Sequence, residues 1–302
     1  MRVTLTGASG LIGSKLVRAL TARGDDVTVL SRDPGRAGQA LGVRAEGWQP
    51  LDEPAPAAAL AGRDAVVHLA GENVAQRWSA SAKEAIRASR EIGTRNLVAG
   101  LGAAAAPERP GALVSSSAVG LYGPHGDEIV DESTPAGDDF LAGVCVAWER
   151  EAERATELGM RVVRVRTGVV LDRRGGALAK MLLPFRLGVG GPVAGGRQYM
   201  PWIHADDVVG MYLAAIDDAG WSGPVNACAP EPVTNAEFSR ALGRALHRPA
   251  VLPIPGAALH VLYGDMAEIV TEGQRAVPRR ALEHGYRFAH PELDEALAAA
   301  LG

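Results

Sequence analysis

Two kinds of hydrophobic pattern alternate along the chain. Short apolar runs, which are typical of buried strands, are separated by stretches where apolar residues recur every three or four positions, as on one face of a helix. The first such pair lies at the N-terminus: Val3 and Leu5, then Leu11, Ile12, Leu16, Val17 and Leu20, up to a stop signal at Gly24. Strands that alternate with helices predict a parallel sheet with right-handed crossovers.

This alternation continues to Thr167 and then loosens. Strands are expected at 26–30, 43–48, 64–71, 112–117 and 161–166, and helices at 36–41, 80–88, 92–101 and 145–158. Beyond Thr167, helices are expected at 178–187, 208–215, 259–270, 281–284 and 293–301, with glycine-rich loops and a proline-rich link at 249–255 between them. No repeat with a period of about 20–50 residues is present, which excludes a solenoid.

A glycine-rich stretch, Leu5-Thr6-Gly7-Ala8-Ser9-Gly10-Leu11-Ile12-Gly13, joins the first strand to the first helix. In this context Gly7 allows a tight turn, Gly10 lets the backbone approach a pyrophosphate, and Gly13 lets the helix pack close to its strand. The free N–H groups of the helix then face the phosphates. An ordinary strand-to-helix turn is the alternative. The position, the flanks and the second strand favour a dinucleotide site formed by Gly7, Ala8, Ser9, Gly10, Leu11, Ile12 and Gly13.

The end of the second strand indicates which dinucleotide binds. Ser31 and Arg32 stand there, about 20 positions after Gly13, where a fold that selects NAD usually has Asp or Glu for the ribose hydroxyls. A hydroxyl followed by a guanidinium suits a 2′-phosphate, which Arg binds in a bidentate fork. The alternative is a solvated surface Arg, and the next residue, Asp33, is acidic. We expect NADP(H) rather than NAD(H).

Composition narrows the class of protein. Hydrophobic residues make up 47% of the chain and charged residues 22%, as in a globular protein with a sizeable core. A net charge of −4 gives no electrostatic case for nucleic acid or an anionic membrane as a partner. The two cysteines, Cys145 and Cys228, lack metal-ligand spacing and fit a reducing compartment. With no apolar run of about 18 residues, we expect a cytoplasmic monomer or homodimer that binds no metal, nucleic acid or membrane.

Further motifs carry a family resemblance. They are Ser115-Ser116-Ser117 followed by Leu121-Tyr122-Gly123, and Trp202-Ile203-His204-Ala205-Asp206-Asp207. Together with the glycine-rich stretch they resemble extended short-chain dehydrogenase/reductases of the NAD-dependent epimerase/dehydratase type. The stretches 263–268 and 273–280 are similar to the small C-terminal domain of an atypical branch, whose members are labelled epimerase family protein or cell-division inhibitor.

Pattern and resemblance imply an α/β fold: a Rossmann-like, doubly wound parallel sheet with a smaller C-terminal substrate lobe over the carboxyl ends of the strands. Residues 1–168 would form the cofactor domain, to which about 200–228 return. Residues 169–200 and 229–302 would form the lobe, with the small C-terminal domain at about 249–302. By resemblance, the cofactor is also lined by Leu69, Ala70, Gly71, Ser115, Thr167, Gly168 and Val169.

The catalytic pattern of that superfamily is incomplete here. A Ser or Thr orients the substrate, a Tyr transfers a proton, and a Lys four residues later lowers the pKa of the Tyr. Ser117 matches the first position. The Tyr-x-x-x-Lys pair is absent, because the helix that would carry it has Val144 and Trp148 at those two sites. The resemblance therefore implies a cofactor-binding protein without the usual proton donor.

Two interpretations follow from this gap. In the first, the protein is an NADP(H)-dependent, epimerase-like oxidoreductase that acts on a small carbonyl or hydroxyl compound with another acid. Tyr122 is the leading candidate, although a phenol with a pKa of about 10 needs a cationic neighbour such as Arg166 or Arg77. His204 is the second candidate. In the other interpretation the protein binds NADP(H) without turnover, as a redox sensor or scaffold.

Several other residues are candidates for the substrate half of the site. Arg side chains suit an anionic group, and Trp side chains form an apolar wall. The candidates are Arg77, Trp78, Trp148, Arg166, Arg197, Gln198, Trp202 and His204. Asp206 and Asp207 are expected to cap the helix that follows them. His68 lies in an apolar strand and is expected to be a hydrogen-bonded core residue.

Overall fold

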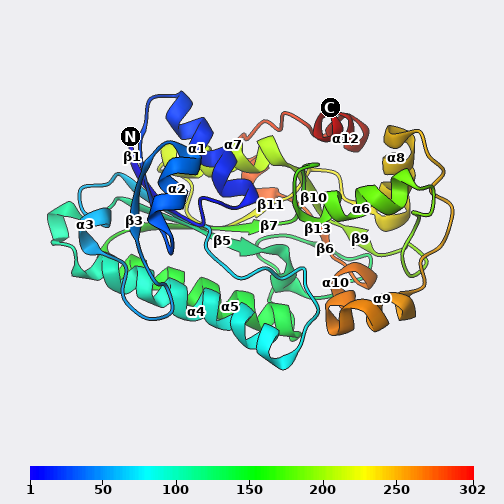
Figure 1. Cartoon of the computed structure of the whole chain (residues 1–302), viewed down its shortest axis with the longest axis horizontal. Coiled ribbons are helices and arrows are strands. Elements are labelled where there is room, and N and C mark those ends of the chain that lie inside the picture. The colour runs from blue at the N-terminus through cyan, green and yellow to red at the C-terminus, as the bar shows by residue number, and fades with distance from the viewer.

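The computed structural model describes all 302 residues. A seven-stranded sheet forms its centre, and all its strands are parallel (Figure 1). The strand order is β11-β7-β5-β4-β1-β2-β3, so the chain winds outward from β1 first to one edge and then to the other. The predicted doubly wound parallel sheet is confirmed. Its strands are β1 (Arg2–Thr6), β2 (Asp26–Ser31), β3 (Arg44–Gly47), β4 (Ala65–His68), β5 (Ala112–Ala118), β7 (Arg161–Thr167) and β11 (Gly223–Ala227).

Helices cover both faces of this sheet. One face carries α1 (Leu11–Ala22) and α7 (Ala205–Asp217); the other carries α3 (Ala57–Leu60), α4 (Ala80–Ala103) and α5 (Phe140–Glu153). The short helix α2 (Pro34–Leu41) lies against β2 and β3. The strands are apolar on both sides because both are covered: Val114 of β5 lies in the core under α1 and α7, and its neighbour Leu113 in the core under α4 and α5.

A smaller lobe is built from the second half of the chain. Its helices α6 (Gly176–Arg186), α8 (Asn235–Leu246) and α12 (Leu293–Leu301) enclose a separate core that includes Trp202, Phe238 and Leu297. Together with α9 (Gly256–Tyr263) and α10 (Glu268–Thr271), this lobe lies at the end of the molecule opposite α3 (Figure 1). None of the helices in the chain combines the length with the apolarity that a membrane crossing requires. Three two-stranded sheets complete the lobe and its junction: β8 (Val169–Leu171) with β10 (Trp202–His204), β9 (Tyr199–Met200) with β12 (Val233–Thr234), and β6 (Ile129–Val130) with β13 (Arg275–Ala276).

Some predicted elements differ from the structure. The helix expected at 259–270 is broken at Gly264, which has a φ of +62°, so that α9 and α10 are separate. The helices expected at 80–88 and 92–101 are one helix, α4, because the Arg and Glu between them favour a helix and continue it. Part of the C-terminal segment expected in the lobe packs on the main sheet instead. There α11 (Arg279–Glu283) lies on β11, and Ala281 belongs to the main core. The sheet domain is thus completed by two later parts of the chain.

Candidate functional site

The glycine-rich stretch forms a tight turn between β1 and α1. Gly7 has a φ of +67°, a backbone conformation that residues with a Cβ rarely adopt. A Cβ on Gly13 would lie 2.4 Å from the Gly7 carbonyl oxygen, and one on Gly7 would lie 2.5 Å from the backbone of Leu69. Both positions therefore require glycine. Gly13 allows the close contact between the turn and α1, and Gly7 allows the close contact between the turn and the end of β4.

The first turn of α1 is open to an anion. Its N-cap residue is Gly10, so no side chain accepts a hydrogen bond from the N-terminal N–H groups, and the first turn contains no acidic residue. Ser9 and Gly10 are both exposed. Unpaired N–H groups at the positive end of a helix form a general binding site for phosphate groups. The geometry thus fits the pyrophosphate that the sequence predicts here.

The end of β2 leaves Arg32 exposed. Its guanidinium makes no hydrogen bond or ion pair within the chain. The carboxylate of its acidic neighbour Asp33 caps α2, where it accepts a 3.0 Å hydrogen bond from the Arg36 N–H. The Ser31 hydroxyl donates to the Asp33 carbonyl oxygen at 3.2 Å. A free cation therefore stands where the sequence predicts that the 2′-phosphate binds.

Buried polar contacts fix the end of β4 beside the turn. The Thr6 hydroxyl oxygen accepts hydrogen bonds from the N–H groups of Leu69 and Ala70, each 3.2 Å long. His68 is fully buried, with Nδ1 2.7 Å from Thr6 Oγ1 and Nε2 3.0 Å from Thr94 Oγ1. The prediction that His68 is a hydrogen-bonded core residue is confirmed, and its contacts hold the end of β4 at the turn.

The pH dependence of folding tests this buried histidine. Burial, with a smaller effect of Arg90, lowers the pKa of His68 to about 4, against about 6.5 in an unfolded chain. The unfolded state then binds the extra proton, so the stabilisation is complete above about pH 6.5 and is lost as the pH falls toward about 4. We expect His68 to account for a loss of about 3 kcal/mol in the free energy of unfolding over this range. Urea titrations at several pH values give the free energy of unfolding of wild type and of His68→Asn. Between about pH 6.5 and pH 4, wild type should lose that much more free energy of unfolding than the variant. Equal losses would show that His68 is not held neutral.

Arg90 of α4 lies beside the same strand end, although the sequence pattern does not indicate it. Its guanidinium carbon is 3.2 Å from the place that a Cβ on Gly71 would take, and 5.0 Å from the ring centre of Trp148. Nη1 donates to the carbonyl oxygens of Glu72 (3.0 Å) and Ile86 (3.3 Å), but no carboxylate pairs with the charge. Arg90 is a half-buried cation at the edge where the cofactor is expected. On a helix rich in polar residues, its sequence neighbours do not distinguish it.

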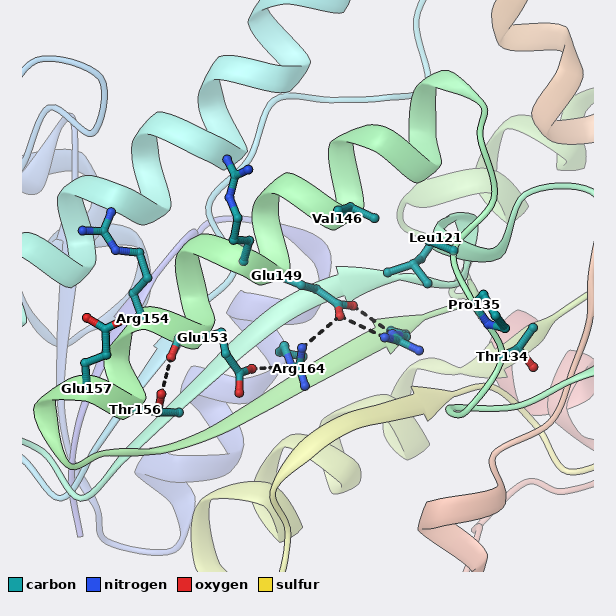
Figure 2. Close-up of a pocket in the computed structure, with 13 residues that line it drawn as sticks. Leu121, Thr134, Pro135, Val146, Glu149, Glu153, Arg154, Thr156, Glu157 and Arg164 are labelled. Atoms are coloured by element: carbon teal, nitrogen blue, oxygen red, sulfur yellow. Dashed lines mark hydrogen bonds and ion pairs between the residues drawn. The ribbon is translucent and has the colours of Figure 1, made fainter.

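Ser117, the expected substrate-orienting residue, belongs to a buried ionic network between β5, β7 and α5. Its hydroxyl donates a 2.6 Å hydrogen bond to Glu149 Oε1, and Ser117 is only 2% exposed. The Glu149 carboxylate also accepts from Arg166, at 2.8 Å from Nε and 2.9 Å from Nη2. Figure 2 shows the same carboxylate directed at Arg164. Because its proton points at Glu149, the Ser117 oxygen can accept a hydrogen bond but does not donate one to a substrate carbonyl.

Tyr122, the expected proton donor, lies in the same network. It is fully buried, and its hydroxyl donates to Asn226 Oδ1 (2.7 Å) and accepts from Arg166 Nη1 (3.0 Å). The sequence thus predicts the cationic neighbour correctly. Burial outweighs that neighbour, however, and raises the pKa of Tyr122 to about 12. The role of proton donor does not fit this position, because the hydroxyl is shielded from solvent and already hydrogen-bonded on both sides.

Most of the expected substrate residues hold the lobe in place instead. Arg77 Nη1 donates to the carbonyl oxygens of Val261 (2.7 Å) and Leu262 (3.2 Å), and Gln198 Nε2 donates to that of Val270 (2.7 Å). Arg166 belongs to the ionic network. The tryptophan candidates are buried: Trp78, Trp148 and Trp202. Only Arg197 among the arginine candidates is exposed and without a hydrogen bond in the chain.

His204 caps α7 and contacts the C-terminal segment. Its Nδ1 accepts a 3.2 Å hydrogen bond from the Asp206 N–H, and its ring lies 4.0 Å from that of His290. Burial lowers the pKa of His204, which is 4% exposed. The Asp207 carboxylate accepts from the N–H groups of Ala289 (2.6 Å) and His290 (3.0 Å). The prediction that the aspartates cap α7 is therefore wrong, because His204 takes that place.

The fold also gathers three residues with metal-ligating groups. One ligand atom each of His204, Asp206 and His290 lies within 4.8 Å of the others. They come from separate segments, so their spacing in the sequence gives no metal signal. Lys15 Nζ lies 3.0 Å from Asp206 Oδ1, and the His204 Nδ1 lone pair is taken by a backbone N–H. Lys15 and a backbone N–H thus occupy two of the groups, and the cluster ties α1 and α7 to the C-terminal segment.

The segment after β7 completes the edge where the cofactor is expected. A Cβ on Gly168 would lie 2.4 Å from the Pro201 carbonyl oxygen, which accepts a 2.7 Å hydrogen bond from the Val169 N–H. Thr167, Gly168 and Val169 are each partly exposed. Ser115 differs from them: it is 1% exposed, so it does not line an open cofactor site. Ser115 and Ser117 share one buried face of β5, whereas Ser116 points to the opposite face and is partly exposed.

A cavity of about 580 Å³ lies between α5 and β7, on the outer side of the ionic network (Figure 2). Some of its charges pair within the lining; Arg164 Nε, for example, is 3.1 Å from the Glu153 carboxylate, whereas Arg154 pairs with Glu151 outside the lining. No residue of the glycine turn, of the end of β4 or of 167–169 lines the cavity, so it is separate from the cofactor edge. The charged lining residues are Glu149, Arg150, Glu153, Arg154, Glu157, Arg164 and Arg166.

Comparison with known proteins identifies the family. Residues 3–228 match the model of the NAD dependent epimerase/dehydratase family. The chain belongs to this family. Residues 254–300 match a domain of unknown function, as in the branch that the motifs indicate. Epimerase family protein SDR39U1 from Bos taurus is 42% identical over 303 residues, with 98% of each chain covered. Epimerase family protein YfhF from Bacillus subtilis is 35% identical over 300 residues, with 99% of this chain and 97% of the relative covered.

Solved structures of the epimerase/dehydratase family agree with the fold. The crystal structure of human epimerase family protein SDR39U1 (isoform 2) with NADPH has a TM-score of 0.89 and 38% identity, and all of both chains is covered. The nucleoside-diphosphate sugar epimerase from Corynebacterium glutamicum has a TM-score of 0.79 at 35% identity, with 58% of that chain covered. UDP-glucuronic acid 4-epimerase from Bacillus cereus in complex with NAD has a TM-score of 0.79 at 16% identity, which is a likeness of fold alone.

The family's usual Tyr and Lys positions are apolar and buried in this chain. Val144 packs with Trp78 and Met266, and Trp148 lies against the Arg90 guanidinium. Neither side chain offers an acidic proton at neutral pH. A group that replaces the Tyr and the Lys must therefore come from another element of the fold.

Proposed function

We propose that this chain binds NADP(H) at the turn between β1 and α1 and acts as an epimerase-like oxidoreductase on a small carbonyl or hydroxyl compound. The open N-terminus of α1 carries the proposal, because Gly10 leaves the first N–H groups free for a pyrophosphate. The crystal structure of human SDR39U1 with NADPH, a protein 38% identical over the whole chain, supports the choice of cofactor.

The 2′-phosphate of the cofactor would bind at the end of β2. Arg32 is exposed and unpaired, and a guanidinium binds a phosphate with two parallel hydrogen bonds. Asp33 Oδ1 accepts a hydrogen bond from the Arg36 N–H and caps α2, so this carboxylate has a structural role apart from any contact with a ribose. The two observations together favour NADP(H) over NAD(H).

Arg32→Ala tests this assignment. A hydrogen bond to a charged group contributes about 1.5–3 kcal/mol, so the variant should bind NADPH about 10- to 100-fold more weakly and NADH with nearly unchanged affinity. Fluorescence titration with each nucleotide gives both constants. Arg44→Ala is the matched control, because Arg44 is a surface arginine of the adjacent strand that pairs with Glu46. An equal loss of affinity for both nucleotides would place Arg32 outside the phosphate site.

The nicotinamide half of the cofactor would lie along the ends of β4, β5 and β7, against 69–71 and 167–169. Arg90 stands beside Gly71 without a carboxylate partner. In the superfamily, a Lys of the missing pair supplies a positive charge at the nicotinamide ribose. We infer that Arg90 supplies that charge here. Its role is in binding, because a guanidinium stays protonated and transfers no proton.

The remaining question is how a proton is exchanged. NADP(H), when bound, would supply or accept a hydride at a carbonyl or hydroxyl-bearing carbon, and the oxygen of that group needs a proton partner. Ser117 is 2% exposed and its proton is directed at Glu149, so its hydroxyl is not open to a substrate. The Tyr122 hydroxyl is buried in the same network and donates to Asn226, so it does not reach a substrate either. Water at the edge of the sheet is therefore the proton partner in this proposal.

A second function, NADP(H) binding without turnover as a redox sensor or scaffold, is favoured by one observation. The two positions that the resemblance assigns to the Tyr-Lys pair hold Val144 and Trp148, and the alternative donor Tyr122 is buried in the ionic network. NADPH absorbance measured with a panel of carbonyl compounds separates the two functions. A decrease in absorbance with some compound supports the oxidoreductase. Tight NADPH binding with constant absorbance across the panel supports the sensor, and failure to bind either nucleotide refutes both.

A further inference from the structure

Large apolar side chains are exposed at the outer end of the lobe. Leu183 on α6 and Leu187 at its C-cap lie one turn apart and are 67% and 68% exposed, and Val251 is 76% exposed. Val189 and Leu252 are 52% and 48% exposed. Exposed apolar side chains that occur singly need no explanation, but a contiguous group marks an interaction site. We call these five residues the apolar patch.

The apolar patch is contiguous because two segments of the chain lie side by side. A Cβ on Gly188 would be 3.8 Å from the Pro249 ring, and one on Gly191 would be 2.1 Å from the Leu252 carbonyl oxygen. The Arg248 side chain donates from Nε to the Arg186 carbonyl oxygen at 3.1 Å. Figure 1 shows α6 and the end of α8 together at the end of the molecule opposite α3.

Basic side chains border the apolar patch. Val251 belongs to a shallow hollow of about 610 Å³ that four basic residues and no acidic residue line. One of the four, Arg244, pairs with Asp294 at 2.8 Å. The others form no ion pair, and neither does Arg186, which lies on α6 between the two leucines. We call these unpaired residues the basic rim: Arg186, Arg240, His247 and Arg248.

We propose that the apolar patch and the basic rim form a peripheral contact with a lipid bilayer that contains anionic lipids. Side chains that are more than two-thirds exposed project from the surface, which suits insertion between headgroups and acyl chains. Unpaired basic residues beside them complement lipid phosphates. A second copy of the chain fits less well, because a two-fold symmetric contact would set one basic rim against the other.

The net charge of the chain does not oppose this contact. Charges act on a surface mainly within a Debye length, about 8–10 Å at physiological salt. The value of −4 averages over all faces, whereas the face that meets the bilayer carries the basic rim. The expectation of no membrane partner rests on that average. The patch and the rim combine two segments about 60 residues apart, 183–189 and 240–252. No continuous stretch of the sequence therefore indicates this surface.

Co-sedimentation with vesicles tests the proposal. The full chain should sediment with vesicles of phosphatidylcholine and phosphatidylglycerol, not with phosphatidylcholine alone, and added salt should release it. The double variant Leu183→Ser, Leu187→Ser should bind at least about tenfold more weakly, because it loses two inserted side chains. Arg186→Gln and Arg240→Gln should each weaken binding about fivefold. Ile129→Ser is the control, because Ile129 is 60% exposed on β6, outside the patch.

Three outcomes overturn the proposal. The first is no sedimentation with the anionic vesicles, and the second is full binding by the leucine double variant. The third is a concentration-dependent dimer in light scattering that Leu187→Ser abolishes, which would assign the face to a second copy of the chain. Circular dichroism and urea denaturation of every variant check that it is folded. The glycine turn lies in the other domain, so the proposal about the lobe can fail while the proposed cofactor site stands.

Discussion

Replacing Gly13 with Ala is expected to weaken NADPH binding at least about 100-fold, or about 2.7 kcal/mol. The added Cβ would lie 2.4 Å from the Gly7 carbonyl oxygen and 2.8 Å from Ala8 Cα, both of them backbone atoms. Relief of that overlap must move the turn or the start of α1. Either movement takes the free N–H groups away from the position in which they bind the pyrophosphate.

The control for this experiment is Gly143→Ala in α5. A Cβ at Gly143 meets nothing within 4 Å, and the position is helical. This variant should bind NADPH as wild type does and be slightly more stable, because Ala favours a helix by about 1 kcal/mol over Gly. Fluorescence titration gives the affinities and urea denaturation the stabilities. If Gly13→Ala bound NADPH normally while remaining folded, the turn would not be the cofactor site.

Arg166→Leu is expected to give the largest loss of stability, about 3–5 kcal/mol, which is the usual cost of a buried charge that loses its partner. Arg166 is 7% exposed and holds both oxygens of Glu149, at 2.8 and 2.9 Å. The variant would also remove the 3.0 Å hydrogen bond that Nη1 donates to the Tyr122 hydroxyl. Urea denaturation at neutral pH measures the change in the free energy of unfolding.

The matched control is Arg154→Leu. Arg154 is also an arginine paired with a glutamate, Glu151, at 3.1 Å, but its side chain is 53% exposed. An exposed ion pair contributes about 0–1 kcal/mol, so this variant should be nearly as stable as wild type. Similar losses for the two variants would show that the stability does not come from the buried network.

The fold and the cofactor turn are predictable because their signals are local. The glycines of the turn, the apolar strand before it and the helical pattern after it are adjacent in the sequence, and each matches its observed conformation. The role of Asp33 is harder to predict. Its charge weakens the prediction of a phosphate site at Arg32, but as the N-cap of α2 it is a helix signal in its own right.

The interior of the candidate site is less predictable, because its contacts join residues that are distant in the chain. Nothing near Ser117 in the sequence indicates that Glu149 accepts its proton, and Tyr122 meets Asn226 only in the folded sheet. A Tyr in a loop after a strand is expected to be accessible to solvent. Here the short helix η2 (Val119–Tyr122) places the Tyr122 side chain in a buried cluster between the two domains. Arg90 is missed for the opposite reason, since its partners are backbone groups that carry no side-chain signal.

Parallel titrations of the purified chain with NADPH and NADH test the central claim most directly. The proposed site at the glycine turn and at Arg32 predicts that both nucleotides bind. It also predicts that NADPH binds at least about tenfold more tightly, through the charged hydrogen bonds to its 2′-phosphate. This preference should disappear in Arg32→Ala. Equal affinities in the wild type, a preference for NADH, or no binding of either nucleotide would contradict the account.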